Sequence, residues 1–123
     1  MSHADPVAEL EAALAFPNTA VIVRGPSVIT EIAGPLTLRR SPEWLTLGED
    51  SGSHIHLRGK DIARCRFVAA VGANAMLELL DSEGELLCKV SFRRTNPARA
   101  DRYDPDFTAT VHTRFTRLAS QAE

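Results

Sequence analysis

Two histidines and an arginine alternate with aliphatic residues in the segment His54-Ile55-His56-Leu57-Arg58. Side chains of a β-strand point alternately to its two faces, so a strand here places both imidazoles and the guanidinium on one face. Imidazole nitrogen is a ligand for transition metals, and the arginine fork binds carboxylates. The segment therefore predicts a surface for an anionic ligand, with or without a metal.

The later strands add cations to this surface by the same alternation. In residues 62–71, Arg64 and Arg66 oppose a run of apolar side chains, and in residues 86–93 Lys89 and Arg93 do the same. We expect one polar sheet face, with Glu78 as a nearby acid, that holds His54, His56, Arg58, Arg64, Arg66, Lys89 and Arg93. The alternative is a solvated face whose charges protect the sheet edges.

Other candidate sites are weaker. His54 and His56 supply two metal ligands, and no third cysteine or carboxylate stands at matching spacing for a zinc site. The sequence has no nucleophile elbow, Walker loop or dinucleotide fingerprint. We expect Trp44 to anchor the core rather than to offer a stacking surface. His112 is expected to be a packing or surface residue, and His3 lies in a terminal segment.

Size and composition indicate one domain that spans residues 1–123. A net charge of −2 argues against a nucleic-acid binder, and no apolar run approaches the roughly 18 residues of a membrane span. The N-terminus lacks the order of a signal peptide. Cys65 and Cys88 stand alone and are expected to be small buried side chains. We therefore expect a cytoplasmic protein.

Turn residues divide most of the chain into short apolar segments. Strands are expected at residues 20–23, 28–33, 36–40, 44–47, 54–58, 62–71, 75–80 and 86–93. Asp5-Pro6 starts a short helix that ends near Phe16, and Asp104-Pro105 starts a longer one that runs to about Ser120. The pattern predicts an α+β fold with an antiparallel meander of about seven to nine strands and these two flanking helices.

Several motifs occur in a characteristic order: Val21-Ile22-Val23-Arg24-Gly25, Trp44-Leu45-Thr46-Leu47, His54-Ile55-His56-Leu57, the hairpin Leu77–Glu85 and Arg93-Arg94-Thr95. From about residue 19 to residue 119 this order resembles the haem-utilisation proteins of the HemS/ChuX type, especially one repeat of the two-repeat members. His56 falls on the Leu-His-Leu position of that family.

The resemblance implies a saddle-like antiparallel sheet with flanking helices, and a bacterial cytoplasmic protein that binds haem. It also implies a homodimer that imitates the two-repeat arrangement. In two-repeat relatives the iron-ligating histidine comes from a helical segment before the first strand. Residues 5–16 contain no histidine, so the resemblance carries over no axial ligand.

We therefore expect a haem-binding or haem-trafficking accessory protein. His54 or His56 would ligate iron or donate a hydrogen bond, and the expected propionate contacts are Arg58, Arg64, Arg66 and Arg93. The first alternative is a non-catalytic interaction module that kept this fold without binding haem. Another anionic small molecule as ligand, or an enzyme that degrades haem, is a further alternative.

Overall fold

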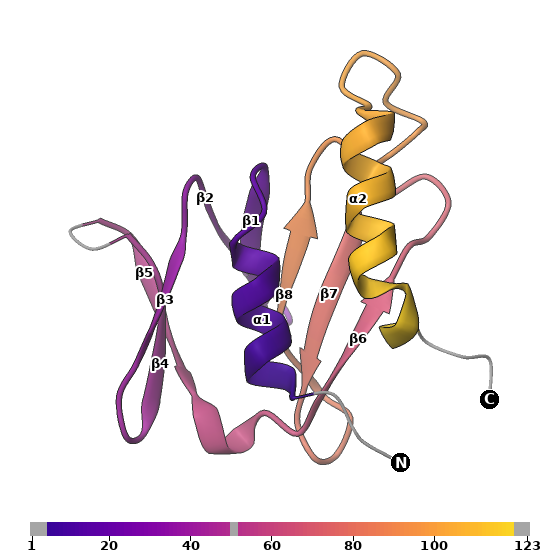
Figure 1. The fold of residues 1–123 in the computed structure, drawn as a ribbon. Coiled ribbons are helices and arrows are strands. Elements are labelled where there is room, and N and C mark those ends of the chain that lie inside the picture. Colours follow the sequence, from indigo (N-terminus) through magenta and orange to yellow (C-terminus); the bar gives the residue numbers. More distant parts are fainter. Residues whose placement is uncertain (1–4, 50–51, 120–123) are drawn as a thin grey trace.

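The computed structural model describes residues 5–49 and 52–119, which form two antiparallel sheets and two α-helices (Figure 1). The elements follow one another as α1 (Pro6–Leu14), β1 (Thr19–Arg24), β2 (Ile29–Ala33), β3 (Thr37–Arg40), β4 (Trp44–Gly48), β5 (His54–Arg58), the 3₁₀ turn η1 (Gly59–Asp61), β6 (Arg64–Val68), β7 (Ala75–Leu80), β8 (Leu86–Phe92), α2 (Pro105–Phe115) and the 3₁₀ turn η2 (Thr116–Leu118). The predicted fold class is confirmed.

The strands divide between a larger and a smaller sheet. The larger has the order β2-β1-β8-β7-β6, and the smaller has the order β3-β4-β5. Both helices lie on the same side of the larger sheet, and α1 also packs against β3 (Figure 1). The chain is therefore more than a simple meander, because β1 and β8, from opposite ends of the strand region, pair side by side.

A short turn separates the two sheets. The sequence predicts one long strand over residues 62–71, but the strand begins only at Arg64 and the preceding Gly59–Asp61 forms η1. The N–H of Gly59 donates to the carbonyl of Glu43 at 3.2 Å, and the N–H of Ile62 donates back to Gly59 at 3.2 Å. This turn redirects the chain, so β6 pairs with β7 and not with β5.

Both helices begin as their sequences predict. Each N-cap is an aspartate followed by proline: Asp5 Oδ1 accepts the N–H of Val7 at 3.1 Å, and Asp104 Oδ1 accepts that of Phe107 at 3.0 Å. The second helix, α2, is shorter than expected and ends at Phe115, where η2 follows. The predicted end near residue 120 lies outside the described residues.

The core lies between the larger sheet, the helices and the inner face of the smaller sheet. Phe67 and Phe92 from the larger sheet pack on Phe115 of α2, with ring centroids 5.9 and 5.5 Å away. Leu10 of α1 and Leu47 of β4 are fully buried. This apolar cluster holds α1 against both sheets, so the outer faces of the sheets remain for binding.

Cys88 is buried as expected, whereas Cys65 is only partly buried. Burial raises the pKa of the Cys88 thiol to about 12. Desolvation, reinforced by the Glu9 carboxylate, raises that of the half-buried Cys65 to about 11. The two residues flank Leu79 on adjacent strands. Two strand spacings put their Cα atoms about 10 Å apart, beyond the roughly 7 Å reach of a disulfide.

These shifts predict alkaline instability. A thiol whose pKa is raised in the folded state stabilises the fold below the unfolded pKa of about 8.5 and loses that contribution as pH rises through the folded value. We expect the free energy of unfolding to fall between about pH 9 and pH 11, and to fall less in Cys88→Ala than in the wild type. Urea unfolding at stepped pH measures this; an identical pH slope in both proteins would contradict it.

Candidate functional site

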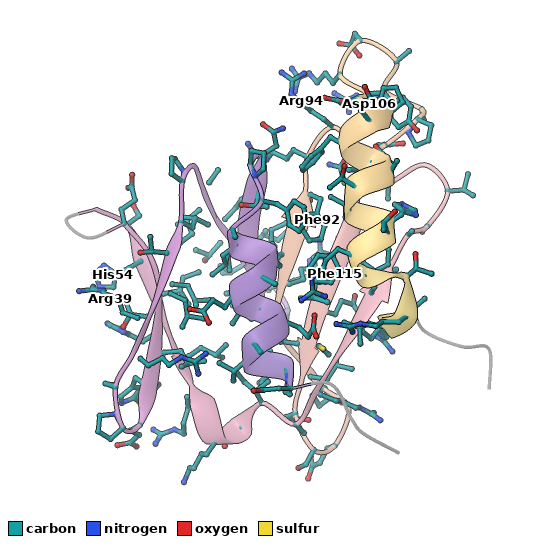
Figure 2. The ribbon with its side chains drawn as sticks, in the orientation of Figure 1. Arg39, His54, Phe92, Arg94, Asp106 and Phe115 are labelled. Carbon is teal, nitrogen blue, oxygen red and sulfur yellow. The ribbon has the colours of Figure 1, made fainter. Side chains whose placement is uncertain are left out.

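The two histidines of β5 lie together on the outer face of the smaller sheet. Their ring centroids are 4.9 Å apart, and both side chains are exposed. Ile55 and Leu57 point the other way and pack against the core. The predicted alternation of this strand is therefore confirmed. Figure 2 shows His54 and Arg39 at the edge of the molecule away from the core residues Phe92 and Phe115.

Hydrogen bonds orient both rings through their Nδ1 atoms. His54 Nδ1 lies 3.0 Å from the carbonyl oxygen of Gly52. A carbonyl oxygen only accepts, so Nδ1 is the donor in this contact, and in the neutral ring Nε2 is the nitrogen left for a metal. His56 Nδ1 lies 3.0 Å from Thr46 Oγ1, its cross-strand neighbour. A backbone carbonyl that fixes the tautomer in this way is typical of histidines that ligate metals.

Trp44 belongs to this surface, and the expectation that it anchors the core is wrong. Its side chain is 37% exposed, and its ring centroid lies 6.4 Å from that of His56. The guanidinium of Arg58, directly across from it in register, lies 4.3 Å over the indole. The strand alternation could have shown this, because Trp44, Thr46 and Arg58 stand at positions that alternate onto the same face as His54 and His56. We call the set Trp44, Thr46, His54, His56 and Arg58 the histidine face.

Acidic residues hold Arg58 in place. Its guanidinium pairs with Glu43 and lies 3.9 Å from Asp61 of η1. Across β4, Arg39 stands in register with Thr46, which in turn pairs with His56. Arg39 is a second cation at this face that the sequence reading did not assign to the site, although it has the right alternation on β3.

The other predicted cations do not join the histidines, and the expectation of one shared face is wrong. Arg64, Arg66 and Arg93 belong to the larger sheet or its end, because η1 turns the chain before β6. Arg66 pairs with Glu78 at 2.7 Å, its register partner, and Lys89 stands on the other side of that glutamate. Arg93 pairs with Glu31 of β2. Both arginine side chains reach solvent and form ion pairs with carboxylates of the same sheet, which is closer to the alternative of a solvated charged face than to a ligand surface.

The remaining candidates add no ligand to the histidine face. His112 packs edge-on against Phe67, with centroids 5.3 Å apart, and is the packing residue that the sequence predicts. His3 lies outside the described residues. Across residues 5–49 and 52–119, no three His, Cys, Asp or Glu side chains gather as a metal site. Within the same ranges no helix is long and apolar enough to cross a membrane.

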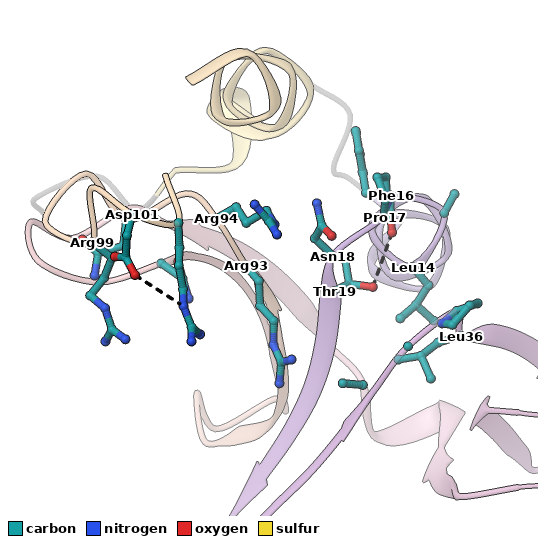
Figure 3. Close-up of a pocket in the computed structure, with 17 residues that line it drawn as sticks. Leu14, Phe16, Pro17, Asn18, Thr19, Leu36, Arg93, Arg94, Arg99 and Asp101 are labelled. Atoms are coloured by element: carbon teal, nitrogen blue, oxygen red, sulfur yellow. Dashed lines mark hydrogen bonds and ion pairs between the residues drawn. The ribbon is translucent and has the colours of Figure 1, made fainter. Parts of the chain in front are cut away.

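A cleft of about 1180 Å³ lies elsewhere, between the α1–β1 turn, the β2–β3 connection and the loop from β8 to α2 (Figure 3). Four arginines line it: Arg93, Arg94, Arg99 and Arg102. The sequence analysis assigned only Arg93 a role. The loop after residue 95 has no periodicity, so nothing in the sequence predicts that its arginines converge on the turn after α1.

Two antiparallel sheets with both helices on one side of the larger sheet form the fold that solved ChuX structures share. A solved structure of ChuX superposes with a TM-score of 0.71 at 16% identity, covering 91% of this chain and 71% of that chain. A structure of the haem-binding protein ChuX gives 0.58 at 14% identity over 85% and 71% of the two chains. No curated protein gives a significant match to the sequence.

The family itself follows from the sequence match. The model of the haem utilisation ChuX/HutX family matches residues 3–105, which is most of the chain. The protein belongs to this haem-utilisation family, and the resemblance noted from its motifs is confirmed.

Proposed function

We propose that this protein binds haem on its histidine face and carries it as a cytoplasmic accessory of haem-iron utilisation. The observation that supports this most directly is the pair of exposed imidazoles 4.9 Å apart beside Trp44. Membership of the ChuX/HutX family points to the same ligand. The two unpaired thiols fit a reducing compartment.

The residues of this face fit the chemistry of haem. Bound haem supplies an iron that accepts imidazole nitrogen and two anionic propionates. Both histidines project from the same side of one strand, so one imidazole would hold the iron and the other would lie close enough to contact the same ligand. We assign ligation to His54, because the contact of its Nδ1 with the Gly52 carbonyl orients the ring and leaves Nε2 available in the neutral form. Trp44, with Arg58 over one face of its ring, would offer an aromatic edge, and Arg58, which already pairs with Glu43, would offer its remaining N–H groups to a propionate.

Titration with hemin tests this function. We expect a saturable shift of the Soret band at micromolar protein with one equivalent bound per chain, because imidazole ligation changes the iron spectrum. A titration with metal-free protoporphyrin serves as control, since it retains the propionates but has no iron to be ligated. Absence of any Soret shift would leave the non-catalytic interaction module as the function of this fold.

We further propose that the protein is a homodimer. β2 is an edge strand of the larger sheet, so no described strand pairs with its outer side, and Ile29 at its start is 59% exposed. An open strand edge is a surface on which a strand of a second copy can pair. Light scattering is expected to give twice the 13.4 kDa of one chain. Ile29→Lys is expected to give monomer, whereas Val71→Lys in the β6–β7 turn retains the dimer; a monomeric wild type would contradict the proposal.

A further inference from the structure

The cleft between the α1–β1 turn and the loop after β8 combines two kinds of lining. One wall is apolar and consists of Leu14, Phe16, Pro17, Pro35 and Leu36. The other carries the four arginines, with the amides of Asn18, Asn74 and Asn96 at the lining as well. Figure 3 shows Arg94 reaching from the β8–α2 loop toward Asn18, with Arg99 and Asp101 farther along the same loop. The cavity exceeds the roughly 300–1,000 Å³ typical of small-molecule sites.

The arginines of this cleft are not all neutralised. Arg93 pairs with Glu31, and Arg102 lies 3.9 Å from Asp101. Among the described residues, the guanidiniums of Arg94 and Arg99 make no ion pair. Asp101 is the one carboxylate in the described lining, so Arg94 and Arg99 leave the cleft with a net positive charge in a chain of net charge −2. Such a concave positive site attracts anions.

The backbone of the cleft carries strain where the lining converges. Asn18 and Arg94 are the two non-glycine residues with positive φ in the described chain, at 62° and 71°, and both line the cleft. Asparagine tolerates this conformation, but arginine is rarely found there. The carbonyl of Arg94 accepts the N–H of Asp104 at 2.8 Å, which fixes the loop to the start of α2. Glycine would adopt this φ without strain, so the presence of arginine at position 94 indicates a role for its side chain.

We propose that this cleft is a second ligand site, separate from the histidine face, for an organic anion with an apolar body. The guanidiniums of Arg94 and Arg99 bind the anionic group, since they form charge-assisted and bidentate hydrogen bonds with carboxylate or phosphate oxygens. The wall from Leu14 to Leu36 covers the apolar part. No iron ligand is required, because the described lining contains no histidine, cysteine, methionine or tyrosine.

Binding of anilinonaphthalene sulfonate, a fluorescent aromatic anion, tests the site. We expect saturable fluorescence enhancement for the wild type, and affinity weaker by about tenfold or more in the double variant Arg94→Gln/Arg99→Gln. The control Arg24→Gln/Lys60→Gln removes the same charge from exposed positions outside the cleft and is expected to bind as wild type. The neutral analogue N-phenylnaphthylamine is expected to bind both double variants equally. Equal affinity of the two double variants for the anion would overturn the proposal.

Two further experiments identify the anionic group that the cleft prefers and distinguish binding in the cleft from haem binding on the histidine face. Octanoate and octyl phosphate share one chain, so the stronger competitor against the fluorophore identifies carboxylate or phosphate; displacement by neither would overturn the proposal. His54→Ala is expected to retain fluorophore binding in full, because its ring is on the other sheet. A loss of fluorophore binding in His54→Ala would show a single site and contradict the inference.

The strained arginine provides a test that a purely structural role would fail. Glycine adopts positive φ without a Cβ penalty, so Arg94→Gly is expected to keep or raise the thermal midpoint while losing fluorophore affinity. A retained or raised thermal midpoint together with a lower fluorophore affinity is typical of a residue whose side chain binds a ligand. A lowered midpoint with unchanged affinity would assign Arg94 to structure alone and overturn its role as a ligand contact.

Discussion

Replacing His54 with alanine is expected to lower hemin affinity by about 100-fold or more and to remove the shifted Soret band. Loss of a residue that only supports a metal ligand costs about 10–100-fold, and loss of the ligand itself costs at least as much. The hydrogen bond from His54 Nδ1 to Gly52, at 3.0 Å, leaves Nε2 as the free nitrogen of this ring. Absorbance titration of the purified variant measures the change.

The neighbouring histidine provides the comparison. His56→Ala is expected to weaken hemin binding by about tenfold and to keep the Soret shift, because His54 remains as the ligand. His112→Gln removes a histidine from α2, far from this face in sequence and packed on Phe67, and is expected to bind as wild type. Wild-type affinity in His54→Ala, or an equal loss in His54→Ala and His112→Gln, would contradict the assignment of the ligand.

Replacing Phe115 with alanine is expected to destabilise the fold by about 3–5 kcal/mol, the range for removing a fully buried phenylalanine. Its ring is fully buried and contacts Phe67, Phe92 and Phe16 within 6 Å between centroids. The variant loses both the transfer free energy of the ring and the packing around the cavity that remains. Urea unfolding followed by circular dichroism measures the loss.

Phe107, on the same helix, is the matched control for this change. Its ring is only partly buried, and it contacts Phe16 at 6.3 Å between centroids. Phe107→Ala is therefore expected to cost clearly less than Phe115→Ala. Equal losses for the two substitutions would mean that the helix, and not the ring packing of Phe115, determines the stability of this region.

The elements of this protein were largely predictable because their signals are local. Aspartate before proline predicts the start of both helices, and the side-chain carboxylates cap them as expected. The hairpin between β7 and β8 is similar: Asp81 Oδ1 accepts the N–H groups of Glu83 and Glu85, both at 2.9 Å, and Gly84 takes φ 83°. Such contacts involve residues within a few positions of one another, so the sequence contains all the information.

The site was predictable only in part. The alternation of His54 and His56 followed from the two-residue period of a strand, and the structure confirms that both rings share an exposed face. The exposure of Trp44 was mispredicted because its size favours the core, although its alternation with Leu45 and Leu47 puts it on the same face as His56 and Arg58.

By itself, the sequence determined where most strands and both α-helices lie, the helix starts and the parity of the histidine strand, because each depends on neighbours along the chain. Only the tertiary structure decided which strands share a sheet. The η1 turn separates β5 from β6, so the histidines lie in one sheet and Arg64 and Arg66 in the other. The pairing of β1 with β8 brings together opposite ends of the strand region. The arginine cleft likewise joins segments about 80 residues apart in sequence, from Phe16 to Arg94. Such long-range convergence depends on how the whole core packs, which no local pattern encodes.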